Sequence, residues 1–426
     1  MMDSLYTAQS GLLTSRYSID TTSNNLANEN TEGYKKRVIN TSELSSLESS
    51  IGNGVSFDGI TRTTNQFLYN QLIKQTSEQS FYEQENEILS QIEIMFQESD
   101  SSGFSVSIND YFQSIENLRS NPSNEIYKTD LENQSEILTS SLKNLYDDLE
   151  SIKENTFTQL TNEVDQVNEI LSQIVYLNEQ IQLSNEPRND LHDKRDKLEK
   201  DLSNYSNIEV DTSNDNYTLK IAGVTTIFNG VNLHEVSITQ EEGNTFLNVY
   251  NNELSLSSGS LKSLSSNLSE DSSFIYSTMQ SLDDFAKALI DEVNANSTTA
   301  ILSGDSVSNM SFDSSAINDL TNDNLENLAQ IQWGEYSIDS ASSGISSFSE
   351  FYQSLRVEIS STVENNNFKL EAQESVVQSL QASFDNFTKV DSDEEMIKLI
   401  EYQAAYEANA KVITVVDEML QTLLNM

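Results

Sequence analysis

The two ends of the chain carry the patterns that decide its fold: residues 5–26 read LYTAQSGLLTSRYSIDTTSNNL and residues 396–426 read MIKLIEYQAAYEANAKVITVVDEMLQTLLNM. In the first stretch apolar residues recur every seven positions with small residues between them, as in a heptad seam: Leu5, Leu12, Ile19, Leu26, and Ala8, Ser15, Thr22. In the second, apolar and small residues follow at steps of three and four: Met396, Ile400, Ala404, Ala408, Val412, Val415, Met419, Leu423, Met426. Neither helix has a partner nearby in sequence, so we predict that the termini pack on each other or on neighbouring copies.

The composition excludes several classes of function. The chain has 426 residues and a formal net charge of -45, from 68 Asp and Glu against 23 Lys and Arg. Phosphates would be repelled by this charge, so we expect no nucleic-acid partner, and anionic membrane surfaces are disfavoured for the same reason. The absence of cysteine excludes disulfides, cysteine nucleophiles and cysteine-ligated zinc. No stretch has the pattern of a Sec signal peptide or the apolar length of a membrane span.

The interior is predicted to be a helical bundle with a small β insertion. The only prolines are Pro122 and Pro187, and no glycine lies between them. A heptad pattern in this segment predicts a long helix: Leu160, Val164, Val167, Leu171, Ile174, Asn178, Ile181. We expect Asn121-Pro122 to begin it, and residues 65–96 and 350–387 to be its partners. Residues 207–256 alternate β-branched residues between glycines, which indicates strands and turns.

The predicted fold class is therefore mainly α, with N- and C-terminal helices paired as a coiled-coil-like layer, an elongated bundle core and a small β insertion domain. The predicted organisation is as follows: 1–50 and 388–426, paired terminal helices, disordered in the free monomer; 51–206 and 257–387, helical bundle; 207–256, β insertion; 297–347, loop-rich. Trp333, the only tryptophan, is expected to be a packing anchor. Ser392 and Glu395 have the spacing of a capping box at the start of the last helix.

The most specific local motif is Thr22-Ser-Asn-Asn-Leu-Ala-Asn-Glu-Asn-Thr-Glu-Gly-Tyr34. Its asparagines place amide groups around the end of a helix, where they can bond exposed carbonyls, and Gly33 can supply a positive φ at the following turn. On composition alone, an Asn-rich surface loop is the simpler interpretation.

Both ends nevertheless resemble the family of bacterial flagellar rod, hook and hook-associated axial proteins. The N-terminal match is Ser10-Gly-Leu12 with Ser23-Asn-Asn-Leu-Ala-Asn-x-Asn-Thr-x-Gly-Tyr34, in which Glu32 stands where the family usually has proline. The C-terminal match runs through Asp393-Glu-Glu-Met-Ile-Lys-Leu-Ile-Glu-Tyr-Gln-Ala-Ala-Tyr406, Ala408-Asn-Ala-Lys-Val-Ile413 and Asp417-Glu-Met-Leu-Gln-Thr-Leu-Leu424. Residues 52–68, 117–122 and 190–198 resemble the hook-associated branch of the family.

The resemblance implies a structural subunit at the junction between hook and filament, required for filament assembly. Implied partners are like subunits in a ring, the hook protein, a second junction protein or filament subunits, and a cytosolic export chaperone. The protein would leave through the flagellar export channel and reside in the extracellular flagellum. The implied assembly residues are Leu5, Leu12, Ile19, Ser23, Asn24, Asn25, Leu26, Ala27, Asn28, Asn30, Thr31, Gly33 and Tyr34. At the other end, assembly and chaperone contacts are implied for Glu395, Met396, Ile400, Tyr402, Gln403, Ala404, Tyr406, Ala408, Val412, Ile413, Met419, Leu420 and Leu423.

No pattern supports an enzyme, a cofactor site or a metal site. His192 lies in a charge-rich helix and is predicted to be on a solvated face, and His234 has no Ser or acid at a diagnostic spacing. Asp211, Ser213 and Asp215 begin like a calcium loop, but Ala222 stands where the bidentate Glu is needed. The alternatives that we consider are a hook or rod axial subunit, a secreted coiled-coil protein of another type III system, and an enzyme in the outer insertion.

Overall fold

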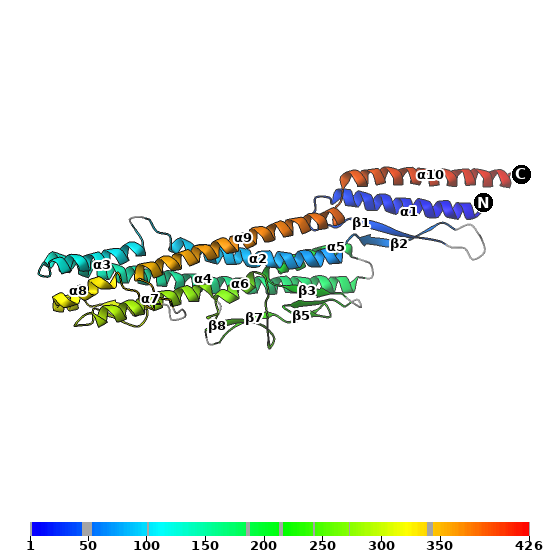
Figure 1. Cartoon of the computed structure of the whole chain (residues 1–426). Helices are drawn as coiled ribbons and strands as arrows, with labels where there is room; N and C mark the ends of the chain where they lie inside the picture. Colours follow the sequence, from blue (N-terminus) through cyan, green and yellow to red (C-terminus); the bar gives the residue numbers. More distant parts are fainter. Residues whose placement is uncertain are drawn as a thin grey trace.

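Both chain ends lie at one tip of a long, mainly helical molecule, as the computed structural model in Figure 1 shows. The structure describes residues 2–44, 53–99, 102–184, 188–212, 216–241, 243–271, 273–338 and 344–425. The predicted mainly α fold with paired terminal helices and a small β insertion is confirmed.

The tip is built by four elements that we call the terminal layer. Helices α1 (Met2–Ala27) and α10 (Ser392–Leu424) run side by side in opposite directions. An antiparallel hairpin of β1 (Arg37–Glu43) and β2 (Val55–Arg62) lies along the other side of α1. The layer thus joins segments from the two ends of the chain.

One of the two rows of the predicted heptad in α1 is confirmed, because Ala8, Ser15 and Thr22 are buried. The other row is displaced by one position: Leu5, Leu12, Ile19 and Leu26 are only half-buried, whereas Ser18 and Asn25 are buried. Gly11 falls in the same series, and a Cβ on it would come within 2.9 Å of Asn409 Nδ2 on α10. Small residues therefore line this interface, because the two helices approach too closely for leucine between them.

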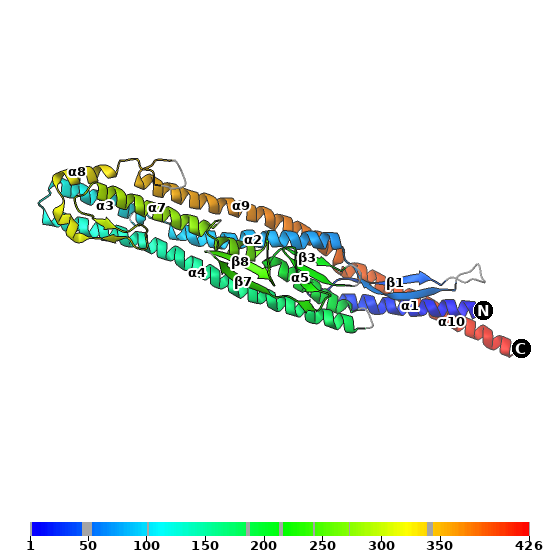
Figure 2. The ribbon, with the colours of Figure 1, turned by 90° about the horizontal axis from the view of Figure 1, so that it is seen from below.

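The bundle is made from helices of very different length. Its long members are α2 (Gln66–Met95), α4 (Glu125–Leu183) and α9 (Phe348–Thr388). Shorter helices cover them: α3 (Phe104–Ser120), α5 (Asn189–Tyr205), α6 (Ser260–Asn267), α7 (Phe274–Ala295) and α8 (Asn322–Ile331). In both views α9 and α2 continue from the terminal layer into the bundle (Figures 1 and 2).

The heptad of α4 is buried as its pattern predicts, from Leu160 to Asn178. Two predictions about this helix were wrong. The start at Asn121-Pro122 is a helix end instead, since Asn121 follows α3 and Asn124 accepts a hydrogen bond from Ile126 N at the start of α4. In addition, α9 packs mainly along α2 rather than on α4. The other predicted partner, α2, does contact α4, although α4 packs more extensively on α3, α5 and α6.

The β insertion consists of two small antiparallel sheets against α4. One contains β3 (Ile208–Asp211), β4 (Thr218–Ile221), β5 (Val224–Phe228) and β6 (Asn232–Leu233) in that order. The other contains β7 (Val236–Glu241), β8 (Asn244–Val249) and β9 (Asn252–Glu253). Their inward residues, including Leu219, Ile227 and Leu247, join the main hydrophobic core.

The segment that was predicted to be rich in loops carries short elements. These are β10 (Leu302–Ser303), β11 (Ser311–Phe312), the 3-10 helix η2 (Ser314–Asp319) and α8. Trp333 is 79% exposed, so its predicted role as a packing anchor was wrong. Of the calcium-like series, Ser213 and Asp215 lie outside the described residues.

Candidate functional site in the paired terminal motifs

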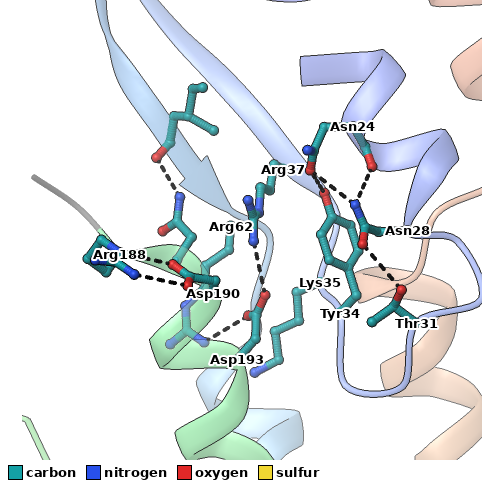
Figure 3. Close-up of polar contacts among 12 residues, drawn as sticks. Asn24, Asn28, Thr31, Tyr34, Lys35, Arg37, Arg62, Arg188, Asp190 and Asp193 are labelled. Atoms are coloured by element: carbon teal, nitrogen blue, oxygen red, sulfur yellow. Dashed lines mark hydrogen bonds and ion pairs between the residues drawn. The ribbon is translucent and has the colours of Figure 1, made fainter. Parts of the chain in front are cut away.

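The asparagine motif forms a closed turn that ends α1 (Figure 3). Asn28 Nδ2 donates to the Asn24 carbonyl at 2.9 Å, and Thr31 Oγ1 donates to Asn28 Oδ1 at 3.2 Å. The hydroxyl of Tyr34 donates back to Asn24 Oδ1 at 3.0 Å. Gly33, at φ +79°, lets the chain reverse without steric cost. The amides thus satisfy the open end of the helix and bring Tyr34 over it.

Asn25 links this turn to the hairpin and to the other end of the chain. Its Nδ2 donates to the Arg37 carbonyl at 2.9 Å, and its Oδ1 accepts from Arg37 N at 3.0 Å, so the amide pairs with β1 as a peptide group would. The same Nδ2 donates to Glu395 Oε2 at 2.8 Å. Asn25 is 1% exposed. An asparagine at this position therefore joins α1, β1 and α10 at one point.

Glu395 is a buried carboxylate at the start of α10. It is 2% exposed, and Lys36 Nζ and Lys398 Nζ lie 3.4 and 3.3 Å from its Oε1. The predicted capping box was wrong: Asp391 caps the helix by accepting from Asp393 N and Glu394 N, and Ser392 donates instead to Glu29. The Glu395 side chain therefore makes the contact between the two motifs, and the Asp391 side chain caps the helix.

Glu394 adds an exposed ion-pair partner beside this contact. Lys36 Nζ and Lys398 Nζ lie 2.8 and 2.7 Å from its carboxylate oxygens. These hydrogen bonds, followed by the charges of the two lysines, lower the pKa of Glu394 to about 2. The start of α10 therefore stays ionised and bound to the segment that precedes β1.

The terminal layer meets the bundle through a cluster of charges on α5. Lys35 pairs with Asp196, and Arg62 Nη1 lies 2.6 Å from Asp196 Oδ2 and 3.2 Å from Asp193 Oδ1. Arg37 Nη2 lies 3.7 Å from Asp193 Oδ2. We call these five residues the joint cluster; Figure 3 shows Arg62 directed at Asp193 from the hairpin. All three cations come from the layer, and both carboxylates come from the bundle.

The two carboxylates respond differently to this environment. Burial raises the pKa of Asp193, and the opposing charge of Arg62 does not overcome it. Burial also acts to raise the pKa of Asp196, but Lys35 and Arg62 outweigh it, so the pKa of Asp196 lies below its ordinary value. Asp196 is therefore the firmly ionised centre of the joint cluster.

A second set of buried polar groups lies behind the joint cluster, inside the bundle. Glu199 accepts from Tyr69 and Tyr217, each at 3.0 Å, and Arg195 Nε lies 3.3 Å from it. Burial and the negative charge of Asp196 raise the pKa of Glu199 to about 7. Burial and the charge of Arg195 lower the pKa of His192 to about 4.

His192 was predicted to lie on a solvated face, but it is half-buried, and its neighbours Asp193, Arg195 and Glu199 on α5 are buried. The sequence feature that indicates this buried face is the spacing of these charged residues. Asp193 and Asp196 are three residues apart and Arg195 and Glu199 are four apart, so each pair shares a helix face.

The predicted assembly residues divide into three groups by burial. Asn25 and Glu395 are buried. The half-buried ones are Leu5, Leu12, Ile19, Leu26, Asn28, Tyr34, Tyr402, Ile413 and Leu420. The exposed ones are Ser23, Asn24, Ala27, Asn30, Thr31, Gly33, Met396, Ile400, Gln403, Ala404, Tyr406, Ala408, Val412, Met419 and Leu423.

The apolar stripe read from the sequence of α10 faces away from α1. The face that contacts α1 carries Glu395, Leu399, Tyr402, Asn409, Ile413, Val416 and Leu420, at steps of three, four or seven. On the other side Ile400 is 66% exposed, and Val412, Val415, Met419 and Leu423 are each about half exposed. We call Met396, Ile400, Val412, Val415, Met419 and Leu423 the outer stripe. It is an apolar face that the described part of the chain leaves exposed.

Among the described residues there is no group of three or more His, Asp or Glu side chains placed to hold a metal ion. No described helix has the length and hydropathy to cross a membrane.

Comparison with known proteins gives consistent matches. Residues 89–310 match the family described as the flagellar hook-associated protein FlgK helical domain. The ends match two further families: residues 5–35 the flagella basal body rod protein, and residues 381–426 the C-terminal part of the flagellar basal body rod FlgEFG proteins.

Flagellar hook-associated protein 1 of Bacillus subtilis strain 168 is 25% identical over 99% of this chain and 97% of its own length. The protein of the same name from Escherichia coli K12 is 29% identical over 48% of this chain and 38% of its own. The solved flagellar hook junction protein FlgK from Burkholderia pseudomallei has a TM-score of 0.48 and 23% identity, over 53% of this chain and 43% of that one.

The paired terminal motifs, the helical body and the matches to flagellar families and to the Bacillus subtilis protein define a structural protein of the bacterial flagellum rather than an enzyme. More specifically, the chain belongs to the family of the flagellar hook-associated protein FlgK, whose helical-domain match spans more than half of it. It is a structural subunit of the junction between hook and filament.

Proposed function

We propose that this chain assembles into a ring at the hook by burying the outer stripe of α10 against neighbouring copies. The single observation that carries the proposal is a helix that uses one face to pair with α1 and leaves a second apolar face exposed. Full burial of an exposed large apolar side chain contributes about 1.5–3 kcal/mol, and the side chains of the outer stripe are about half exposed, so burial of each contributes roughly half of that to association. The residues of both motifs are then assembly residues, and the terminal layer is the axial core.

A ring at the end of the hook would have a different partner on each of its two faces. The ring contacts the hook protein below, and above it a second junction protein or the first filament subunits. Before assembly an exposed apolar stripe promotes aggregation, so a cytosolic export chaperone covers the C-terminal motif until the chain passes through the flagellar export channel. Helices with few buried residues are also easily unfolded for such passage.

The outer halves of α1 and α10, far from the bundle, fold stably only on assembly. Within α10 only Glu395 and Val416 are buried among the described residues. A helix with so little burial obtains most of its stability from contacts that the single chain does not supply.

The test replaces two residues of the outer stripe, Ile400→Glu with Val412→Glu, in the chromosomal copy. The matched control is Glu401→Gln with Glu407→Gln, on exposed positions of the same helix. We expect finished hooks without filaments for the first variant and normal filaments for the control in electron micrographs. Normal filaments on the first variant would refute the stripe as the assembly surface, and absent or malformed hooks would indicate a rod or hook subunit instead.

Deletion of residues 396–426 extends the test. We expect it to abolish junction assembly and to leave a soluble helical bundle, because neither hydrophobic core cluster contains a residue of α10. Retained filament growth would contradict the proposal.

A further inference from the structure

The terminal layer and the bundle are joined almost without apolar contact. The two hydrophobic core clusters of the described chain lie wholly in the bundle and the insertion, and no residue of α1, β1, β2 or α10 belongs to either. The layer buries its own residues, such as Ala8 and Val416, within itself. Packing therefore stabilises each part but does not set the angle between them.

The contacts that cross the boundary are polar, and the strongest are those of the joint cluster. Lys35 is 5% exposed, and its ammonium group also lies 5.1 Å from the ring centre of Tyr69 and 5.6 Å from that of Phe384. Outside the cluster, Asn189 Nδ2 donates to the Ile60 carbonyl at 3.0 Å, and Lys36 N donates to the Thr388 carbonyl at 2.8 Å. An exposed pair of Glu32 and Lys197 adds little, because solvent screens it.

The distribution of charge makes this cluster unusual for the chain. Basic residues are scarce, 23 against 68 acidic ones, yet three of them meet two carboxylates here. The groups come from three separate segments: Lys35 and Arg37 before and at the start of β1, Arg62 at the end of β2, and the two aspartates on α5. The three cations thus hold two segments of the layer against one helix of the bundle.

We propose that the joint cluster is a charge latch that sets the angle between the terminal layer and the bundle. Removal of one partner from an ion pair that is shielded from water leaves the other charge buried and uncompensated, which is strongly destabilising. With the latch intact the two parts form one rigid body. Without it the layer swings about the chain segments that connect it, while the bundle stays folded. The latch lies at the base of the layer, so it acts whether or not the outer ends of α1 and α10 are folded.

The test measures the angle in the full-length chain by distances between two spin labels. The chain has no cysteine, so labels can be attached at Glu371→Cys on α9 and Glu401→Cys on α10, both exposed. A second pair, Glu371→Cys with Glu154→Cys on α4, lies within the bundle and reports its integrity. The latch is removed from the bundle side by Asp193→Asn with Asp196→Asn, and from the layer side by Lys35→Met.

We expect a narrow distance distribution between α9 and α10 in the parent chain, and one about twofold or more wider in both latch variants. The distribution within the bundle should stay unchanged. The matched control is Asp190→Asn, also on α5, whose carboxylate pairs with the neighbouring Arg188 rather than with the layer; it should leave both distributions narrow. A broad distribution in the parent chain with an intact bundle, or narrow ones in both latch variants, would overturn the proposal. Broadening within the bundle would also overturn it, because the cluster would then stabilise the bundle itself.

Discussion

Asn25 donates a hydrogen bond from Nδ2 to Oε2 of Glu395 at 2.8 Å, although 370 residues separate them in the chain. Asn25 belongs to the N-terminal motif and Glu395 to the C-terminal motif that the chain shares with flagellar axial proteins. The two motifs therefore meet through a specific buried contact as well as through general helix packing. A buried amide and carboxylate of this kind favour one register between α1 and α10, because a shift takes the amide donor away from a buried carboxylate oxygen.

Replacement of Asn25 by Asp should unfold the terminal layer. Aspartate has no N–H donor, so the Arg37 carbonyl and Glu395 Oε2 both lose the donor that Asn25 supplies, and a second carboxylate lies beside the first. We expect a cost of about 2–3 kcal/mol to the layer, seen as loss of helical circular dichroism and of assembly. Asn30→Asp, at an exposed position of the same motif, is the control and should change neither signal. Equal helicity in both variants would show that the contact is dispensable.

Enlargement of Gly11 should force α1 and α10 apart. A Cβ at this position would lie 2.9 Å from Asn409 Nδ2, so Gly11→Val should destabilise the helix pair by about 1–3 kcal/mol through overpacking. Addition of Asn409→Ala should restore much of the loss, since it removes the side chain that clashes. Electron micrographs of cells that carry the three variants supply the comparison, because this part of the helix pair folds on assembly: filaments should be lost with Gly11→Val and regained with Asn409→Ala. No rescue by the second substitution would mean that the helices do not meet here.

Two buried groups of α5 should give the bundle opposite responses to pH. Glu199, which faces Tyr69, Tyr217, Arg195 and Asp196, has a pKa raised from 4.5 to about 7, so the folded state binds the extra proton and stability falls as pH rises through this range. His192 has a pKa lowered from 6.5 to about 4, so the unfolded state binds the extra proton and stability rises with pH between these values.

The two effects can be separated by substitution. Glu199→Gln should make the free energy of unfolding increase more steeply with pH, and His192→Gln should make it decrease. Urea unfolding of the full chain at several pH values between about 4.5 and 7 measures the slopes. Parallel curves for the parent and both variants would show that neither group titrates on unfolding.

Limited proteolysis should distinguish the outer layer from the bundle. Lys411 on α10 and Lys74 on α2 are both exposed on helices, so trypsin can approach either residue. Cleavage requires local unfolding, which is easier in α10 because this helix has few buried residues. We expect trypsin to cut the free chain after Lys411 well before Lys74. Cleavage at equal rates would count against folding of the outer layer on assembly.

Much of the architecture follows from local patterns. The heptad from Leu160 to Asn178 predicts a buried stripe on a long helix, and the structure contains that stripe. Spacing alone predicts it, because residues three or four apart always lie on the same face of a helix. The strands of residues 207–256 follow from their β-branched residues and glycines in the same way. The Asn-rich motif also predicts the end of α1, since its amides bond groups within a few residues of them.

Residue spacing along the chain therefore sets which segments are helices and strands and which faces of them are apolar. Which face contacts which partner depends on packing between segments that are distant in the sequence. Periodicity predicts an apolar stripe on α10 but does not say which segment packs against it. In the structure α1 packs against the other face of α10, where Gly11 allows the two helices to approach closely. In the same way the burial of Asp193 and Asp196 depends on cations more than a hundred residues away, so no local pattern distinguishes them from solvated charges.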